Sequence, residues 1–91
     1  MKNVTQTSKP IERAPRIRPV PAVSRAIAIL RLLGKTRSPM GVNAIAQALG
    51  IVPSTCLHIL RALVEEKLLS FDRSSKHYRL GAGMLTLARS A

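Results

Sequence analysis

The stretch "IAQALGIVPSTCLHILRAL", Ile45 to Leu63, contains two helical patterns separated by a single glycine. Apolar residues recur at helical spacing on both sides of Gly50, and glycine readily takes the left-handed conformation with which helices end. Pro53 suits the first turn of the second helix, where a backbone N–H has no partner within the helix. The stretch is therefore predicted to fold as helix, tight turn and helix, the arrangement of a helix-turn-helix motif.

The second helix of this motif, predicted over residues 53–66, has two chemically different faces. The face predicted to be buried consists of Cys56, Ile59, Leu60, Leu63 and Val64. The outward face is predicted to consist of Ser54, Leu57, His58 and Arg61, with Pro53 at its start and Thr55 at its flank. Hydroxyl, imidazole and guanidinium groups donate to phosphates and base edges, and an apolar side chain can contact a thymine methyl group. This face is predicted to read nucleic acid; the alternative is an ordinary solvated helix face.

Two helices are expected to precede the glycine turn. The first is predicted over residues 22–34 and the second over residues 42–49, with residues 35–41 as a loop. The first helix is predicted to bury Val23, Ala26, Ile27, Ile29, Leu30 and Leu33. Ala28 and Leu32 fall among its polar residues, where they are either simply exposed or in contact with a second subunit. Residues 1–21 contain four prolines and no periodicity, so a disordered basic tail is expected there, either a solvated leader or an arm that contacts DNA phosphates.

After Lys67 the period of the sequence changes from helical to alternating. Residues 68–72 and 77–80 are predicted to form two strands around the polar turn "RSSK", with Leu69, Phe71, Tyr78 and Leu80 on one face. The predicted fold is thus mainly α with a small β-hairpin, a winged helix-turn-helix over residues 22–80. Residues 81–91 are predicted to start a linker helix. The basic hairpin residues, predicted to reach DNA backbone or minor groove unless they serve only solubility, are Arg73, Lys76, His77 and Arg79.

The charge balance points to a polyanionic partner. Fifteen Lys and Arg residues stand against four Asp and Glu, a formal net charge of +11. The first 21 residues hold five basic residues and one acidic residue, so +4 of this charge belongs to the tail and +7 to the remaining 70 residues. Such an excess is typical of nucleic-acid binding, so duplex DNA is the predicted partner.

Other chemistries are not supported by the pattern of residues. Cys56 and His58 fall on opposite helix faces, and adjacent Glu65 and Glu66 face different directions, so no metal site, cofactor site or catalytic pair is predicted. The glycines at 81 and 83 lack the third glycine of a dinucleotide-binding loop. The chain is therefore not expected to be an enzyme. One cysteine, no visible secretory signal and short apolar runs indicate a cytoplasmic protein.

Three segments together resemble a known family: "PAVSRAIAILRLL" (21–33), "LGIVPSTCLHILRAL" (49–63) and "HYRLG" (77–81). They are similar to the N-terminal winged helix-turn-helix domain of the IclR (isocitrate lyase regulator) type of bacterial transcription factor, over residues 21–88. The resemblance implies a transcriptional regulator, usually a repressor, that binds operator DNA as a homodimer through its first helix and its linker helix. It implies Ser54 and Thr55 as DNA contacts, and a glycine where this chain has Lys67. The family's effector-binding domain does not occur within these 91 residues, so the chain is expected to be either a fragment or a stand-alone DNA-binding module.

Two other function classes are possible for a small basic domain of this kind, an RNA-binding winged helix and a protein-interaction module. A winged helix that binds single-stranded RNA would need exposed aromatic side chains for stacking, and this chain has one Phe and one Tyr. A protein-interaction module would use the first helix and residues 81–91 as a dimer surface, with the charge incidental. A salt titration with duplex DNA distinguishes DNA binding from the interaction module. Phosphate contacts make affinity fall steeply with salt, whereas an interaction module would show a flat response.

Overall fold

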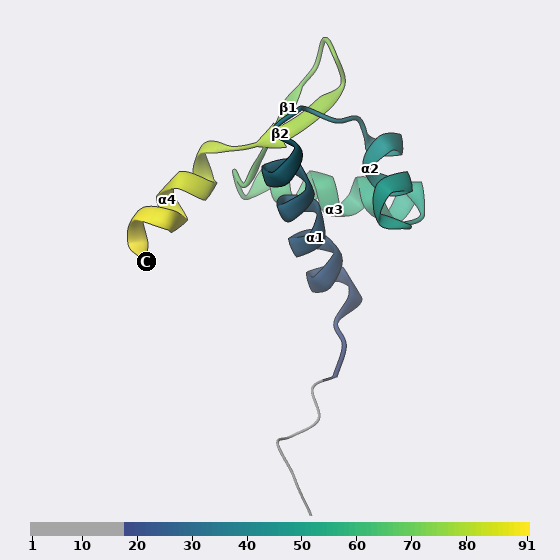
Figure 1. Cartoon of the computed structure of the whole chain (residues 1–91), viewed down its shortest axis with the longest axis horizontal. Coiled ribbons are helices and arrows are strands. Elements are labelled where there is room, and N and C mark those ends of the chain that lie inside the picture. Colours follow the sequence, from purple (N-terminus) through teal and green to yellow (C-terminus); the bar gives the residue numbers. More distant parts are fainter. Residues whose placement is uncertain (1–17) are drawn as a thin grey trace, which may run out of the picture.

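The computed structural model describes residues 18–91, so the tail predicted over residues 1–21 lies almost wholly outside the described residues. The described part is mostly helical and contains one two-stranded antiparallel sheet, as predicted (Figure 1). In chain order its elements are α1 (Pro21–Thr36), α2 (Val42–Leu49), α3 (Pro53–Glu65), β1 (Leu69–Asp72), β2 (His77–Leu80) and α4 (Ala82–Ser90).

The turn between α2 and α3 is the predicted helix-turn-helix. Gly50 has a φ of 66°, in the left-handed region, and the N–H of Ile51 donates to the carbonyl of Ala46 at 2.9 Å. This is the pattern with which a left-handed residue ends a helix and satisfies its last carbonyls. The two helices meet at 113°. Ile51 is buried in this angle, so the residue that follows the turn also packs into the core.

The core lies where α1, α2 and α3 meet the inner face of the sheet. Its buried residues are Ile29, Leu33, Ile45, Ala46, Ile51, Cys56, Leu60, Leu63, Leu69 and Tyr78. On α3 the buried residues belong to the predicted stripe, and Ile59 and Val64 are half buried beside them. The apolar periodicity therefore predicted the inner face of α3 well.

The inner face of α1 was predicted less well. Val23 is 54% exposed and Ile27 is 45% exposed, although both were expected to be buried. The N-terminal end of α1 extends past the other helices (Figure 1). Val23 meets α3 only across an open hollow of about 290 Å³, which it lines with His58 and Ile59, so it stays half exposed. Leu32 and Ala28, expected on the polar side, are half buried. The reason is that the C-terminal half of α1 packs against α2, α3 and β2 and is enclosed on more than one side.

The hairpin has the register that the alternating pattern predicted. Leu69 pairs with Leu80 and Phe71 with Tyr78, and the last two rings lie 4.7 Å apart between centroids. The turn is stabilised by Asp72, whose carboxylate accepts the N–H and the hydroxyl of Ser74 at 3.0 and 2.8 Å. These hydrogen bonds lower the pKa of the exposed Asp72 carboxyl.

One pairing of the sheet was not predicted. The loop after α1 contains Met40, which forms an isolated antiparallel bridge to Tyr78. The Met40 N–H donates to the Tyr78 carbonyl at 3.0 Å, and the Tyr78 N–H donates back at 2.7 Å. Strand β2 consequently has hydrogen-bond partners on both sides, which anchors the base of the hairpin to the segment between α1 and α2.

The turn that ends α3 contains a strained residue. Lys67 has a φ of 66°, and its N–H donates to the Val64 carbonyl at 3.0 Å while the Leu68 N–H donates to Leu63 at 2.9 Å. This geometry matches the turn at Gly50, but here a side chain occupies the left-handed position. A residue with a Cβ pays about 1–2 kcal/mol for that conformation, whereas glycine does not.

Lys67→Gly is therefore expected to raise the free energy of unfolding by about 0.5–1 kcal/mol, because glycine's larger entropy in the unfolded chain offsets part of the relief. Urea denaturation of both proteins measures the difference. Lys67→Ala, which removes the ammonium but keeps the Cβ, is the matched control and should change stability by less than about 0.5 kcal/mol. An equal gain from both substitutions would assign the effect to charge instead of backbone strain.

Candidate nucleic-acid interface

The outer face of α3 is open to solvent. Ser54, His58 and Arg61 are exposed, Pro53 is exposed at the helix start, and Thr55 is half buried at the flank. These residues are held outward because Cys56, Leu60 and Leu63 fix the opposite side of the helix in the core. The polar side chains predicted to read nucleic acid thus share one surface along α3. Leu57, the apolar residue predicted to lie among them, does not.

The N-terminus of α3 has the properties of an anion-binding end. Its N-cap residue, Val52, forms no side-chain hydrogen bond, and the first turn contains no acidic residue. The first N–H groups of a helix have no intrahelical partner, and the helix dipole adds positive potential there. The two acidic residues of this region, Glu65 and Glu66, lie at the other end of the helix. A phosphate near Ser54 would therefore meet backbone donors and no opposing carboxylate.

Leu57 differs from its predicted outward position. It is half buried and lines a hollow of about 450 Å³ between α3 and the hairpin. The other lining residues are Arg61, Val64, Glu65, Phe71 and Tyr78. Leu57 turns this way because its helix position is one turn from Arg61 and beside the buried stripe, on the side that faces the hairpin.

Arg61 connects the outer face of α3 to the hairpin. Burial raises the pKa of the Tyr78 phenol, and the positive charge of Arg61 partly opposes this rise. The guanidinium is therefore close enough to the ring to act on it electrostatically. Arg61 also lines the hollow with Phe71 and Tyr78, so its side chain lies between the outer face of α3 and the hairpin.

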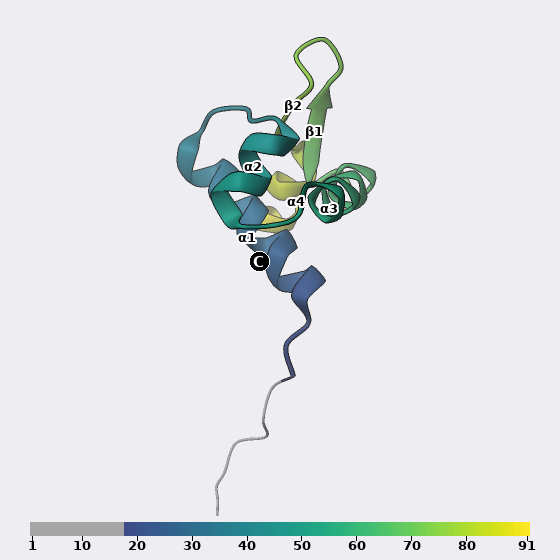
Figure 2. The ribbon, with the colours of Figure 1, turned by 90° about the vertical axis from the view of Figure 1, so that its right-hand side faces the viewer.

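The hairpin separates its four basic residues into two groups. Arg73 and Lys76 are exposed in the turn between the strands, which projects beyond the helices (Figure 2). Lys76 has a φ of 63°, and its N–H donates to the Asp72 carbonyl at 2.7 Å, so the tight turn fixes its backbone. His77 directly follows the turn and pairs with Asp72, and its ring lies beside Gly41 at the start of α2.

Arg79 lies away from the other predicted contacts. It lines a hollow of about 510 Å³ together with Arg37, at the end of α1. The loop that carries Arg37 lies on the opposite side of the molecule from α3 (Figure 2). The structure thus brings the α3 residues together on one face and the turn residues together at the hairpin tip, but Arg79 joins neither group. Arg37 was not singled out from the sequence, because nothing local indicates that it lies beside β2.

No group of three or more metal-ligating side chains occurs in residues 18–91. Cys56 is fully buried, and desolvation raises the pKa of its thiol, which disfavours the reactive thiolate. Within the same residues, no single helix combines the length and hydropathy needed to cross a bilayer.

Residues 22–73 match the model of the IclR helix-turn-helix domain. The chain belongs to the IclR family. It is 39% identical over 70 residues to the glycerol operon regulatory protein of Streptomyces coelicolor, an alignment that covers 77% of this chain and 28% of that protein.

Solved structures of IclR regulators have the same fold. The IclR transcriptional regulator from Alicyclobacillus acidocaldarius superposes with a TM-score of 0.77 at 37% identity, over 81% of this chain and 30% of that chain. The IclR family regulator from Brucella abortus gives 0.71 at 30% identity, over 78% and 27%. The present IclR chain therefore spans less than a third of the length of these relatives. The predicted family and the winged-helix fold are confirmed, and with them DNA-binding transcriptional regulation as the function of this class of domain.

Proposed function

We propose that this domain recognises a specific duplex sequence by placing α3 in the major groove, as the DNA-reading part of an IclR-type regulator. The observation that carries the proposal is the outer face of α3, where Ser54, His58 and Arg61 are exposed beside an uncapped helix N-terminus. The 113° bend turns α3 away from the direction of α2, and a helix with its side chains is about 10–12 Å across, which fits a groove about 12 Å wide. The face is bordered by α1 at His58 and by the hairpin at Arg61, and all three side chains remain exposed between them.

Electrostatics supports the same docking. Residues 18–91 hold eleven Lys and Arg residues and three Asp and Glu residues. The hairpin tip presents Arg73 and Lys76 beside α3, at the position where a wing contacts backbone or minor groove. In this arrangement α3 supplies base contacts and the tip supplies phosphate contacts. Arg79, which lies further from the tip, contributes mainly to the positive potential, and His77, directly after the turn, contacts the backbone with the tip.

The proposed assembly is a homodimer formed through α1 and α4. Both helices present apolar side chains to solvent: Val23 and Ile27 on α1, and Leu85 and Leu87, 54% and 58% exposed, on α4. Covering such side chains against a second copy gains about 25 cal/mol per Å² of apolar surface. A two-fold dimer would present its α3 helices to half-sites about 34 Å apart. The proposed regulator is cytoplasmic, non-enzymatic and a repressor.

Selection of bound sequences from random duplex DNA, followed by a salt titration on the selected sequence, tests the proposal. The expected result is enrichment of an inverted repeat, with affinity that falls by about one logarithmic unit per released counterion for each tenfold increase in salt. A salt-independent response would favour a protein-interaction module. Stronger binding to single-stranded RNA of the same sequence would favour the RNA-binding alternative. Enrichment of an unpaired half-site would contradict the homodimer.

The same assay distinguishes base contacts from phosphate contacts. Arg61→Ala is expected to cost about 1–3 kcal/mol on the selected sequence and little on unrelated duplexes, if its guanidinium reads a base. Lys76→Ala is expected to weaken binding to all duplexes evenly and to reduce the salt slope by about one. Arg37→Ala removes the same charge on the side away from α3 and is the matched control. An equal loss from Arg61→Ala on every sequence would make Arg61 a phosphate contact.

A further inference from the structure

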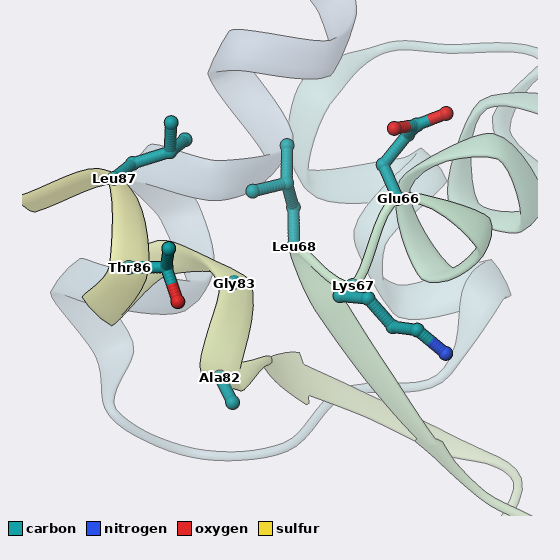
Figure 3. A pocket seen from close by; sticks show the side chains of 7 residues that line it. All are labelled: Glu66, Lys67, Leu68, Ala82, Gly83, Thr86 and Leu87. Atoms are coloured by element: carbon teal, nitrogen blue, oxygen red, sulfur yellow. The ribbon is translucent and has the colours of Figure 1, made fainter. Parts of the chain in front are cut away.

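Helix α4 begins directly on the turn that ends α3. The Gly81 N–H donates to the carbonyl of Leu68, and the Gly83 N–H donates to the carbonyl of Lys67, both at 2.8 Å. Figure 3 shows the start of α4, at Ala82 and Gly83, beside this turn, with the Lys67 side chain pointing away from α4. Two backbone hydrogen bonds therefore join the linker helix to the C-terminal end of the proposed reading helix.

This joint leaves no room for a side chain at either glycine. A Cβ on Gly81 would lie 2.5 Å from the Lys67 carbonyl oxygen, and a Cβ on Gly83 would lie 2.6 Å from the same atom. Ordinary contacts of a Cβ lie at 3.4–4 Å, and the atoms that obstruct here are backbone atoms, which cannot rotate away. Only glycine at both positions lets the two segments approach so closely. By contrast, a Cβ on Gly34 would meet only a Leu80 methyl carbon, at 3.6 Å.

Beyond the joint, α4 has little contact with the rest of the domain. None of its residues is buried; Gly83 and Met84 are half buried, and every residue from Leu85 onward is exposed. Figure 1 shows α4 extending away from the other helices toward the C-terminal end. The direction of α4 is consequently set at its first turn, where the glycines lie.

We propose that Gly81 and Gly83 are positioning residues that fix the direction of α4 relative to α3 and thereby select the half-site spacing that the dimer reads. This inference rests on the proposed function, because it needs a dimer that joins through α4. A nine-residue helix is about 13 Å long, so a tilt of about 20° at its start moves its far end by about 5 Å. One base-pair step is about 3.4 Å along the duplex. A small tilt at the joint thus corresponds to a change of about one or two base pairs in spacing.

Gly83→Ala tests the inference on a series of duplexes in which two selected half-sites are separated by spacings that differ by one base pair. The Cβ is expected to push α4 away from Lys67, because α4 makes few other contacts that resist the movement. The expected result is a shift of the preferred spacing by at least one base pair, or a fivefold or greater loss of discrimination between spacings. Affinity for a duplex with one half-site should remain within about twofold, because α3 and the hairpin are unchanged.

Gly34→Ala is the matched control, since it adds the same methyl group at an exposed helical position with ordinary contacts. It should leave the preferred spacing unchanged. Gly81→Ala repeats the test at the other glycine. Spin labels at Asn43→Cys on α2 and Arg89→Cys on α4, both exposed, report the direction of α4 within one chain. Their distance should change in Gly83→Ala and stay constant in Gly34→Ala; Cys56 is buried and does not compete for the label.

The outcomes separate the two proposals. If the unsubstituted protein binds no duplex selectively, the proposed function fails and this inference fails with it. If it binds, but Gly83→Ala keeps both the spacing preference and the label distance, the joint does not position α4 and the inference is overturned. If Gly83→Ala loses affinity equally for one half-site and for two, the glycine supports the fold instead of the spacing, which also overturns the inference.

Discussion

Ser54→Glu is expected to lower affinity for duplex DNA by at least about 100-fold while leaving the fold equally or slightly more stable. Ser54 is exposed in the first turn of α3, where no acidic residue is present. A carboxylate there faces the N-terminal end of the helix dipole, which favours it by about 0.3–1 kcal/mol. The same carboxylate would lie against DNA phosphates in the proposed complex, and opposed like charges cost several kcal/mol. Stability and binding should therefore change in opposite directions.

Fluorescence anisotropy with the selected duplex and urea denaturation measure the two effects on one protein sample. Ser54→Gln has nearly the same size without the charge and is the matched control. It is expected to lose far less affinity, because an amide can still donate to a phosphate or a base edge. If the glutamate variant binds as tightly as the glutamine variant, the N-terminus of α3 does not meet DNA, and the docking proposed for this helix is wrong.

Leu60→Ala is expected to lower the free energy of unfolding by about 2–5 kcal/mol. Leu60 is fully buried, on the inner face of α3, in the cluster that α1, α2, α3 and the sheet share. Removing its isobutyl group loses the transfer energy of the buried atoms and leaves a cavity that a closely packed core fills only in part. Because single domains are stable by only about 5–15 kcal/mol, this loss takes a large share of the total.

Urea denaturation followed by circular dichroism provides the measurement. Val52→Ala is a control that also shortens an aliphatic side chain, but this side chain is 65% exposed, so the change should be below about 0.5 kcal/mol. A loss at Leu60 no larger than the loss at Val52 would mean that the inner face of α3 is not tightly packed. The outward direction of Ser54, His58 and Arg61 depends on that packing.

Local chemistry explains what the sequence predicted correctly. The helix-turn-helix could be predicted because Gly50 and Pro53 act within one turn of the backbone that they shape. The inner face of α3 followed from a 3.6-residue period, and the pairing of Phe71 with Tyr78 followed from alternation around a short turn. In each case the interacting residues are close in the chain, so the local sequence pattern is enough to predict how they are arranged.

The predictions that were wrong or absent concern contacts between segments that are distant in the sequence. Periodicity showed that Val23 and Ile27 share an apolar face, but not that α3 meets this end of α1 only across an open hollow that leaves both exposed. Leu57 was placed outward because a helical wheel does not include the hairpin, which forms the other wall of its hollow. The bridge from Met40 to Tyr78 joins segments nearly forty residues apart in sequence, and no local signal indicates it.

By itself, then, the sequence determined the order of the elements, the glycine turn, the stripe that faces inward and the basic character of the chain. The sequence also placed Arg73 and Lys76 in one turn, but tertiary structure alone placed Arg79 beside Arg37. It also brings the backbone of Lys67 so close to Gly81 and Gly83 that neither position has room for a side chain. The physical reason is that backbone preferences act over a few neighbouring residues, whereas contact, coverage and excluded volume depend on segments that only folding brings together.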